Sequence, residues 1–181
     1  MTPTPDIEIS EASLNDKPVL RRLLELYQYD FSEFEGTDVG PHGLYGYGYL
    51  DHYWTEPDRH PYLIRVGGQL AGFALVNRHG VSGEDRRSVA EFFVMRKYRG
   101  RGVGEYAAAH VFDLWPGKWE MTQAASHPGS SAFWRKVIGR YMRGAFEERQ
   151  AEQGAQHGPV QFFDNSGHAA GRATGLGKGG I

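Results

Sequence analysis

The chain has 181 residues, of which 40% are hydrophobic and 23% are charged, and its formal net charge is -2. This composition is that of an ordinary globular protein, and the mildly negative charge argues against a general nucleic-acid binder. Because the chain has no cysteine, disulfides, thiolate metal sites and a cysteine nucleophile are excluded, and we predict no metal site.

Two features bear on location and domain organisation. The N-terminal residues 1–6 lack a charged start followed by an apolar core, and no apolar run approaches the ~20 residues that span a bilayer. We therefore expect a cytoplasmic protein without a membrane segment. We expect one domain over residues 1–165 and a glycine-rich, flexible tail over residues 166–181, to which we assign no function.

The N-terminal quarter predicts a strand followed by a helix. Residues 7–9 alternate as in a short strand, and Asn15-Asp16 precedes the helix as its cap. The apolar stripe of this helix consists of Val19, Leu20, Leu23, Leu24 and Leu26. Residues 27–54 mix aromatic and acidic side chains with glycines, so we do not expect a smooth amphipathic helix there.

The middle of the chain predicts a hairpin and a third strand. Strands over residues 62–66 and 70–76 flank Gly67-Gly68-Gln69, which is typical of an antiparallel pair with a short glycine turn. After a polar loop, residues 89–94 form a mostly apolar run. This run predicts a buried strand that leads into a basic, glycine-rich segment.

The last part of the chain alternates helices and strands. Residues 103–114 predict a helix, and residues 119–124 predict the strand after it. We expect Ser130 or Ser131 to cap a short helix, and residues 160–163 to form the last strand.

A glycine-rich loop lies between the strand at residues 89–94 and the helix that follows it. Gly100, Gly102 and Gly104 lack side chains, which lets the backbone close around an anion while the first helical N–H groups point at it. The same loop carries four cations: Arg96, Lys97, Arg99 and Arg101. Because cations beside oriented amides suit a ligand with several phosphates, this loop is our candidate binding site.

The spacing of the loop distinguishes between phosphate ligands. A nucleoside-triphosphate loop needs Gly-Lys followed by Ser or Thr, which is absent, and the dinucleotide fingerprint needs its third glycine where Glu105 stands. The pattern that remains is R-x-x-G-x-G, formed by Arg99, Gly102 and Gly104. After an apolar strand, this pattern resembles the acyl-CoA loop of the GNAT superfamily of N-acetyltransferases. A solvated turn or a disordered RNA-binding stretch is the alternative.

The resemblance implies a fold. Residues 91–94 look like the fourth strand of the family, residues 132–134 look like part of the helix after its fifth strand, and most of residues 7–163 can be placed on its order of elements. We therefore expect an α/β (α+β) fold with a mixed, mostly antiparallel central sheet flanked by helices. The fourth and fifth strands are expected to splay apart.

The resemblance also implies acetyl-CoA as the cosubstrate. Its pyrophosphate is expected on the loop formed by Arg99, Gly100, Arg101, Gly102, Val103 and Gly104. For Arg101, a solvent-facing side chain is the alternative to a phosphate contact. The pantetheine arm is expected to pair with the backbone near Phe93, Val94 and Met95, in the gap between the splayed strands.

Acyl transfer to an amine requires a base that takes the proton of the ammonium group. Glu91 is the candidate, because a carboxyl buried in an apolar strand without a cationic partner has a raised pKa. The alternative is a glutamate paired with a neighbouring arginine. Where family members often have a tyrosine acid this chain has Trp134, and His127 stands where an asparagine is frequent. Tyr141 or water is left as the acid, with packing as the alternative role of Tyr141.

The aromatic and acidic segment 27–54 precedes the hairpin, where family members commonly build the acceptor pocket. Aromatic faces and carboxylates attract cations, so we expect the acceptor to be a primary amine of a small molecule or peptide. A core role for these aromatics is the alternative. The predicted function is N-acetylation by direct transfer, and a homodimer is compatible with the sequence. A catalytically silent acyl-CoA-binding module, favoured by Trp134, and an RNA-binding protein are the competing functions.

Overall fold

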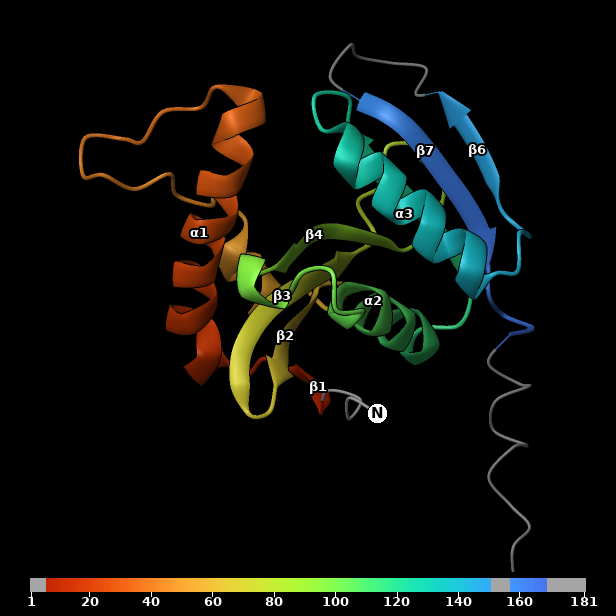
Figure 1. Ribbon diagram of the computed structural model, residues 1–181, viewed down its shortest axis with the longest axis horizontal. Helices are drawn as coiled ribbons and strands as arrows, with labels where there is room; N and C mark the ends of the chain where they lie inside the picture. The colour runs from red at the N-terminus through yellow and green to blue at the C-terminus, as the bar shows by residue number, and fades with distance from the viewer. Residues whose placement is uncertain (1–5, 151–156, 169–181) are drawn as a thin grey trace, which may run out of the picture. The chain divides into compact units, whose positions relative to one another are not determined.

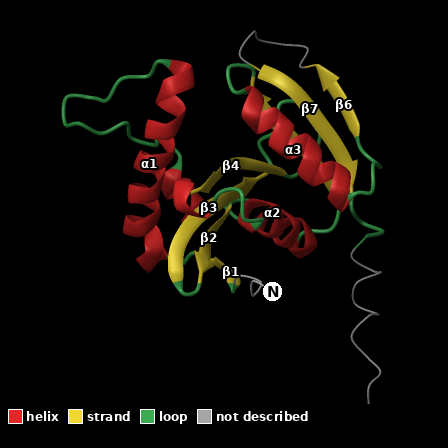
Figure 2. Ribbon diagram, viewed as in Figure 1, coloured by secondary structure: helices red, strands yellow, loops and turns green. Residues whose placement is uncertain are grey.

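The computed structural model describes residues 6–150 and 157–168. The helices and strands are β1 (Ile7–Glu11), η1 (Leu14–Asp16), α1 (Lys17–Glu35), η2 (Leu50–Trp54), β2 (His60–Val66), β3 (Gln69–Asn77), β4 (Ser88–Val94), η3 (Arg96–Tyr98), α2 (Val103–Leu114), β5 (Lys118–Ala124), α3 (Pro128–Tyr141), β6 (Glu147–Gln150) and β7 (His157–Asp164). Three strands in succession, β2 to β4, form the middle of the described chain, with helices before and after them (Figure 1, Figure 2). None of the helices in the described part is long and apolar enough to cross a membrane.

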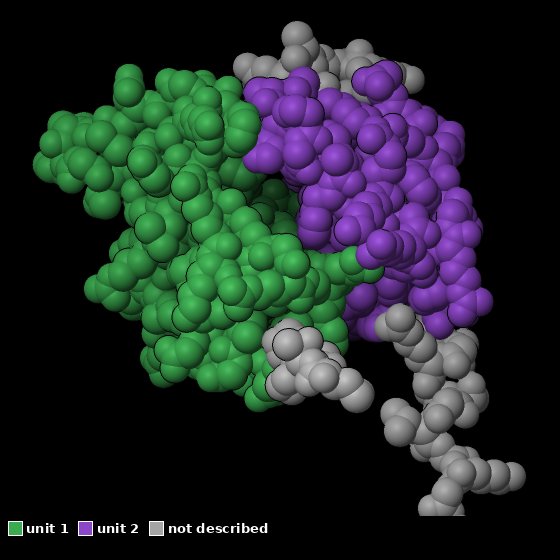
Figure 3. Space-filling view, viewed as in Figure 1, with its two compact units in different colours: residues 1–78, 89–107 green, residues 79–88, 108–181 purple. Residues whose placement is uncertain are grey.

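The chain divides into two compact units, which are coloured separately in Figure 3. Unit 1 comprises residues 1–78 and 89–107, and unit 2 comprises residues 79–88 and 108–181. The single domain over residues 1–165 therefore stays a prediction. Of the expected tail, only residues 166–168 are among the described residues.

Unit 1 is built on a four-stranded sheet with the order β1-β2-β3-β4. The pairs β1/β2 and β2/β3 are antiparallel. Gly67 and Gly68, which join β2 to β3, have φ angles of 55° and 74°. Positive φ at both central positions is the requirement of the tight hairpin turn that matches strand twist. The predicted hairpin is therefore confirmed.

The two faces of this sheet are covered by different helices. Leu63, Phe73 and Phe93 belong to one buried cluster with residues of α1. Ile64 and Val94 belong to a second cluster, which contains Val103 and Ala107 of α2. Because neighbouring strand residues point to opposite faces, β4 presents Phe93 towards α1 and Val94 towards α2. Each fully buried side chain of this size stabilises the fold by about 1.5–3 kcal/mol.

Helix α1 is longer than the sequence pattern indicated. It continues through residues 27–35, where no smooth helix was expected, and ends at Gly36, whose φ is 66° and whose N–H donates to the carbonyl of Ser32 (2.9 Å). Leu26, assigned to the apolar stripe, is instead 49% exposed. The helix continues because its later turns have partners of their own, described below.

Unit 2 contains the three-stranded antiparallel sheet β5-β7-β6. Its core is aromatic: the rings of Trp119 and Phe163, which are paired across β5 and β7, stack at 6.0 Å. The ring of Phe112 lies 5.0 Å from Trp119 and 4.9 Å from Phe163, edge to face. This packing holds the end of α2 on the sheet.

The structure confirms the mixed fold with separated fourth and fifth strands, because β4 and β5 belong to different sheets. The predicted helix at residues 103–114 and the predicted strands at residues 119–124 and 160–163 are present, whereas β6 was not predicted. The expected cap at Ser130 or Ser131 was wrong. The helix starts earlier, at Pro128, a residue whose fixed φ suits the first helical position.

Candidate active site

The glycine loop joins η3 to α2 within unit 1. Gly100 and Gly102 have φ angles of 71° and 78°, in the left-handed region that costs a residue with a side chain about 1–2 kcal/mol. A Cβ added at either position would meet no atom of the described residues within 4 Å. The N–H of Tyr106 donates to the carbonyl of Gly102 (3.0 Å), so the amides before it lack a helical partner. Open space beside such amides fits an anion.

The arginines of this loop have different contacts. Arg96 donates from Nε (3.0 Å) and Nη2 (2.8 Å) to Oδ1 of Asp30. Arg99 donates from Nε to the carbonyl of Val94 (2.6 Å) and from Nη2 to Oδ2 of Asp30. Arg101 is exposed and has no hydrogen bond or ion pair to any described residue. Both Arg99 and Arg101 were predicted to assist in binding the phosphate. In the structure the guanidinium of Arg99 is bound to Val94 and Asp30, whereas that of Arg101 has no partner among the described residues.

The strand before the loop, β4, lies at the edge of its sheet. A Cβ at Gly72 would come within 1.9 Å of the carbonyl oxygen of Phe93, so only glycine allows the backbones to approach this closely. The N–H of Met95 already donates to the carbonyl of Ala71 (2.8 Å), and the carbonyl of Val94 accepts from Arg99. The predicted pairing of a pantetheine arm with residues 93–95 therefore has to use the backbone N–H and carbonyl groups that these two hydrogen bonds leave free.

Glu91 lies on β4, two residues before Phe93 and on the same face, which packs against α1. The hydroxyl of Tyr27 donates to Oε2 of Glu91 (2.6 Å), and the hydroxyl of Tyr47 is its second partner. Burial is the largest effect on the pKa of Glu91 and raises it. The two hydroxyls lower this pKa and the charge of Glu35 raises it, so the pKa of Glu91 lies above its ordinary value. The described contacts of Glu91 include no arginine or lysine, in contrast to the ion-pair alternative.

The two tyrosines serve Glu91 as neutral donors. Burial and the nearby charge of Glu91 raise the pKa of both Tyr27 and Tyr47, so neither ionises near neutral pH. Both tyrosines belong to the predicted acceptor segment 27–54, but their pairing with Glu91 was not predicted. The aromatic character of this segment was the one signal of the pairing in the sequence. Tyr27 and Glu91 lie 64 positions apart, and a sequence pattern does not show which distant residues meet.

Tyr47 belongs to the segment between α1 and η2, which is fastened to α1. Oε2 of Glu25 accepts from the N–H of Tyr45 (2.8 Å), and Oε1 accepts from the N–H of Gly46 (2.9 Å). Nε2 of Gln28 donates to the carbonyl of Gly46 (2.9 Å). Helix α1 therefore fixes the backbone immediately before Tyr47.

The candidates in unit 2 are engaged in packing and capping. Trp134 is buried against the ring of Phe112. The hydroxyl of Tyr141 donates to Oδ1 of Asp113 (2.8 Å) and accepts from Nδ2 of Asn165 (3.1 Å). These contacts favour the packing role of Tyr141.

His127 caps α3. Its Nδ1 accepts from the N–H of Ser130 (2.9 Å), which satisfies one of the amides at the start of the helix. The N-cap of α3 is therefore His127, where Ser130 or Ser131 was expected.

A strand, a glycine loop and a helix N-terminus thus follow one another in unit 1. A sequence model described as the acetyltransferase (GNAT) family matches residues 20–139, which include all of these features. The chain belongs to the GNAT acetyltransferase family. It is therefore an acyltransferase, and the acetyl transfer of this family takes acetyl-CoA as cosubstrate. No curated protein matches the chain.

Solved GNAT structures share the fold. An acetyltransferase from Thermus thermophilus superimposes with a TM-score of 0.64 at 15% identity, over 87% of this chain and 96% of that one. Spermidine N-acetyltransferase from Vibrio cholerae, in complex with CoA and spermine, gives 0.60 at 9% identity over 88% and 96%. The ribosomal-protein-S18-alanine N-acetyltransferase from Escherichia coli gives 0.56 at 12% identity over 87% and 93%. At these identities the likeness shows the GNAT fold.

Proposed function

We propose that this GNAT acetyltransferase transfers the acetyl group of acetyl-CoA directly to a primary amine of a small molecule or peptide, with Glu91 as the general base. One observation carries the proposal: Glu91 is a partly buried carboxyl with two tyrosine donors, on the strand that leads into the glycine loop. The raised pKa brings Glu91 closer to working pH, where a base is most effective.

The residues of unit 1 divide the chemistry between them. The amides from Arg99 to Gly104 hold the pyrophosphate, and Arg101 adds a charge that has no other described partner. Glu91 takes a proton from the ammonium group, directly or through one water. The amine nitrogen then forms a bond to the thioester carbonyl carbon and the carbon–sulfur bond breaks. The leaving thiolate takes up, directly or through water, the second proton that the nitrogen loses as the amide forms. Because the phenols of Tyr27 and Tyr47 stay protonated, they can hold Glu91 without competing for that proton.

An amine acceptor is supported by the surroundings of Glu91. Tyr27 and Tyr47 contribute aromatic surface, and Glu35 is close enough to affect the pKa of Glu91. Aromatic faces and carboxylates both favour an ammonium group over an anion. Two of the similar structures are enzymes whose names specify N-acetylation, of spermidine and of the alanine of a ribosomal protein.

The test is release of free thiol from acetyl-CoA in the presence of a panel of primary amines. With an accepted amine we expect turnover, and Glu91→Gln should lower kcat by about 10²–10⁴-fold, the usual contribution of a general base. The affinity for acetyl-CoA should not change. Glu8→Gln is the matched control, because Glu8 is an exposed glutamate on β1 of the same sheet. Equal turnover of the wild type and Glu91→Gln would remove Glu91 from the mechanism.

A catalytically silent acyl-CoA-binding module is the second candidate. It is favoured by unit 2, where Trp134 is buried and the hydroxyl of Tyr141 is used by Asp113, so neither side chain is an evident acid for the leaving thiolate. The same assay separates the two functions. A silent module would bind acetyl-CoA and release no thiol above the background with any amine.

A further inference from the structure

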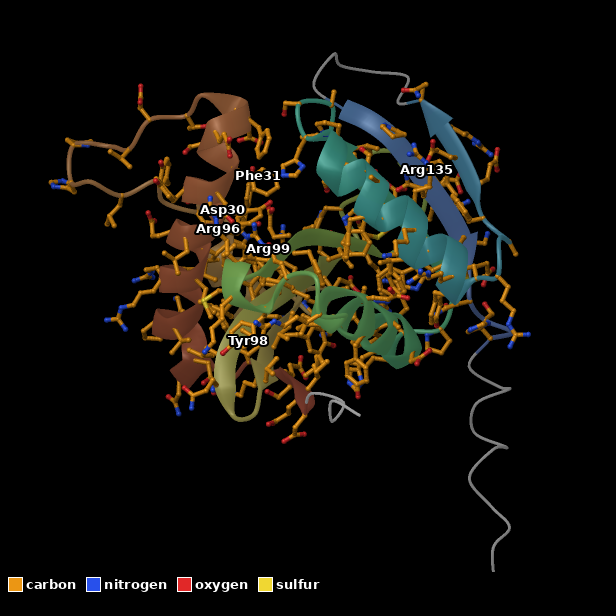
Figure 4. All side chains as sticks on the ribbon, in the orientation of Figure 1. Asp30, Phe31, Arg96, Tyr98, Arg99 and Arg135 are labelled. Carbon is orange, nitrogen blue, oxygen red and sulfur yellow. The ribbon has the colours of Figure 1, made fainter. Side chains whose placement is uncertain are left out.

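Arg96 of η3 and Arg99 at the start of the glycine loop share one carboxylate on α1. Asp30 receives Arg96 at Oδ1 and Arg99 at Oδ2, and its side chain is 15% exposed (Figure 4). Burial alone would raise the pKa of Asp30, but the hydrogen bonds from Arg99 and Arg96 outweigh it and lower the pKa below the usual value. Asp30 therefore stays ionised and both of its oxygens are used.

Arg99 is held at three points. Its Nε donates to the carbonyl of Val94, its Nη2 donates to Asp30, and its guanidinium carbon lies 5.6 Å from the centre of the Phe93 ring. The residue thus folds back onto the end of β4 and is tied to α1. Gly100 follows immediately, so the first turn of the glycine loop starts from a backbone position that these contacts fix.

The face of α1 that holds Asp30 also reaches the candidate base. Tyr27, Asp30 and Phe31 are three and four residues apart, so they share one face of the helix. The rings of Tyr27 and Phe31 lie 4.5 Å apart, and the Tyr27 hydroxyl donates to Glu91. One helix face thereby contacts β4 at Glu91 and the start of the loop at Arg99.

We propose that Asp30 is a positioning residue for acetyl-CoA binding: through Arg99 and Arg96 it fixes the start of the glycine loop on α1, and leaves the phosphate to the loop amides and Arg101. This assignment rests on the proposed function of the loop. It differs from the sequence expectation, in which Arg99 itself assisted the phosphate.

Positioning and simple electrostatics predict opposite results for Asp30→Asn. Loss of the carboxylate adds a positive charge beside the loop, which by itself attracts an anionic cosubstrate and does so most strongly at low salt. Loss of the anchor releases Arg99 and makes the loop more variable, which weakens binding because the loop has to be ordered again. The sign of the change in affinity therefore distinguishes the two roles.

The experiment is a calorimetric titration of the wild type and Asp30→Asn with acetyl-CoA at low and at high salt. We expect Asp30→Asn to raise the Kd about fivefold, the low end of ordinary coupling between two parts of a protein. Asp58→Asn is the matched control, because it removes the same charge from an exposed aspartate that pairs with Arg78 in the same unit (3.5 Å). It should leave the Kd unchanged.

A second variant keeps the charge and removes the geometry. Arg99→Lys retains the cation but loses the planar fork that reaches both Val94 and Asp30. We expect it to raise the Kd as Asp30→Asn does, and the double variant to add little further, because both changes break one contact. Thermal melts of each variant report whether unit 1 remains folded.

The outcomes are separable. If the wild type binds acetyl-CoA and Asp30→Asn binds it equally or more tightly, Asp30 is not a positioning residue. The positioning role would also be rejected if Arg99→Lys bound acetyl-CoA with the affinity of the wild type. It would be rejected as well if the loss of binding free energy in the double variant equalled the sum of the two single losses. If the wild type itself fails to bind acetyl-CoA, the proposed function fails, whatever the variants do.

Discussion

The hydroxyl of Tyr27 adjusts the acidity of a carboxyl that is otherwise governed by burial. It donates to Glu91 at 2.6 Å, and this hydrogen bond lowers the pKa of Glu91 against the larger effect of burial, which raises it. Removing the hydroxyl while keeping the ring leaves burial with less opposition. The pKa of Glu91 should therefore rise further.

Tyr27→Phe tests this relation through the pH dependence of the rate. A general base works only when it is deprotonated, so kcat/KM for the amine falls as the pH drops through the pKa of Glu91. We expect the acidic limb of the profile to move to higher pH in Tyr27→Phe. Tyr29→Phe is the control, because Tyr29 lies on α1 but is 64% exposed. An unmoved limb, or one that moves to lower pH, would contradict the assignment of Glu91.

Single residues were predictable where one strand or loop determined them. Glu91 stood out as a charge within an apolar strand and the glycines stood out by their spacing, while the roles given to them stay predictions. The partners of these residues could not be found, since Tyr27 and Asp30 lie on another element, 64 and 69 positions away from Glu91 and Arg99. Sequence patterns describe one element at a time and contain no distances between elements.

Among the elements, the segment between α1 and η2 depends on its attachment to α1. Both oxygens of Glu25 accept backbone N–H groups, from Tyr45 and Gly46. Hydrogen bonds to an ionised acceptor are stronger than neutral ones. Since Tyr47 comes next in the chain, Glu25 holds the backbone that presents the Tyr47 hydroxyl to Glu91.

Glu25→Ala should release this segment without touching the cofactor loop. We expect kcat/KM for the amine to fall about tenfold, the lower value of a hydrogen bond to a charged group, while the Kd for acetyl-CoA stays the same. Hydrogen exchange should increase at residues 45–47. Glu33→Ala, which removes an exposed carboxylate from the same helix, should do neither. If exchange at residues 45–47 is unchanged in Glu25→Ala, Glu25 does not hold the segment.

The elements that the sequence missed have physical reasons in common. Strand β6 consists of Glu147, Glu148, Arg149 and Gln150, all exposed. An edge strand of charged residues has no apolar alternation to detect. The second half of α1 was missed because its aromatic residues are interspersed with the acids Asp30, Glu33 and Glu35 and are followed by glycines. Tyr27 and Asp30 are instead held by contacts with Glu91, Arg96 and Arg99.

At the scale of the whole molecule, the order of elements was more predictable than their ends. The series from β1 to β5 follows from hydrophobic periodicity and glycine turns, which are local properties. The two sheets and the division of α2 between the units depend on pairing and packing between distant segments. The family resemblance supplied what periodicity could not, namely that the fourth and fifth strands splay apart; in the structure β4 and β5 belong to different sheets.

Acetyl-CoA binding by the glycine loop of this acetyltransferase is the step on which the proposed function depends. It is tested by calorimetric titration of the wild type and of Gly102→Glu with acetyl-CoA, with ATP and NAD as control ligands at the same salt. The added glutamate places a side chain and a negative charge in the space that is open beside Gly102. Gly102→Ala, which has the same strain at a φ of 78° without the charge, is the matched control.

We predict selective binding of acetyl-CoA to the wild type in the micromolar range. Gly102→Glu should show no measurable binding, Gly102→Ala should show intermediate binding, and thermal melts should show that each variant is folded. Normal binding of acetyl-CoA by folded Gly102→Glu, or equal binding of all three ligands by the wild type, would contradict this role of the loop.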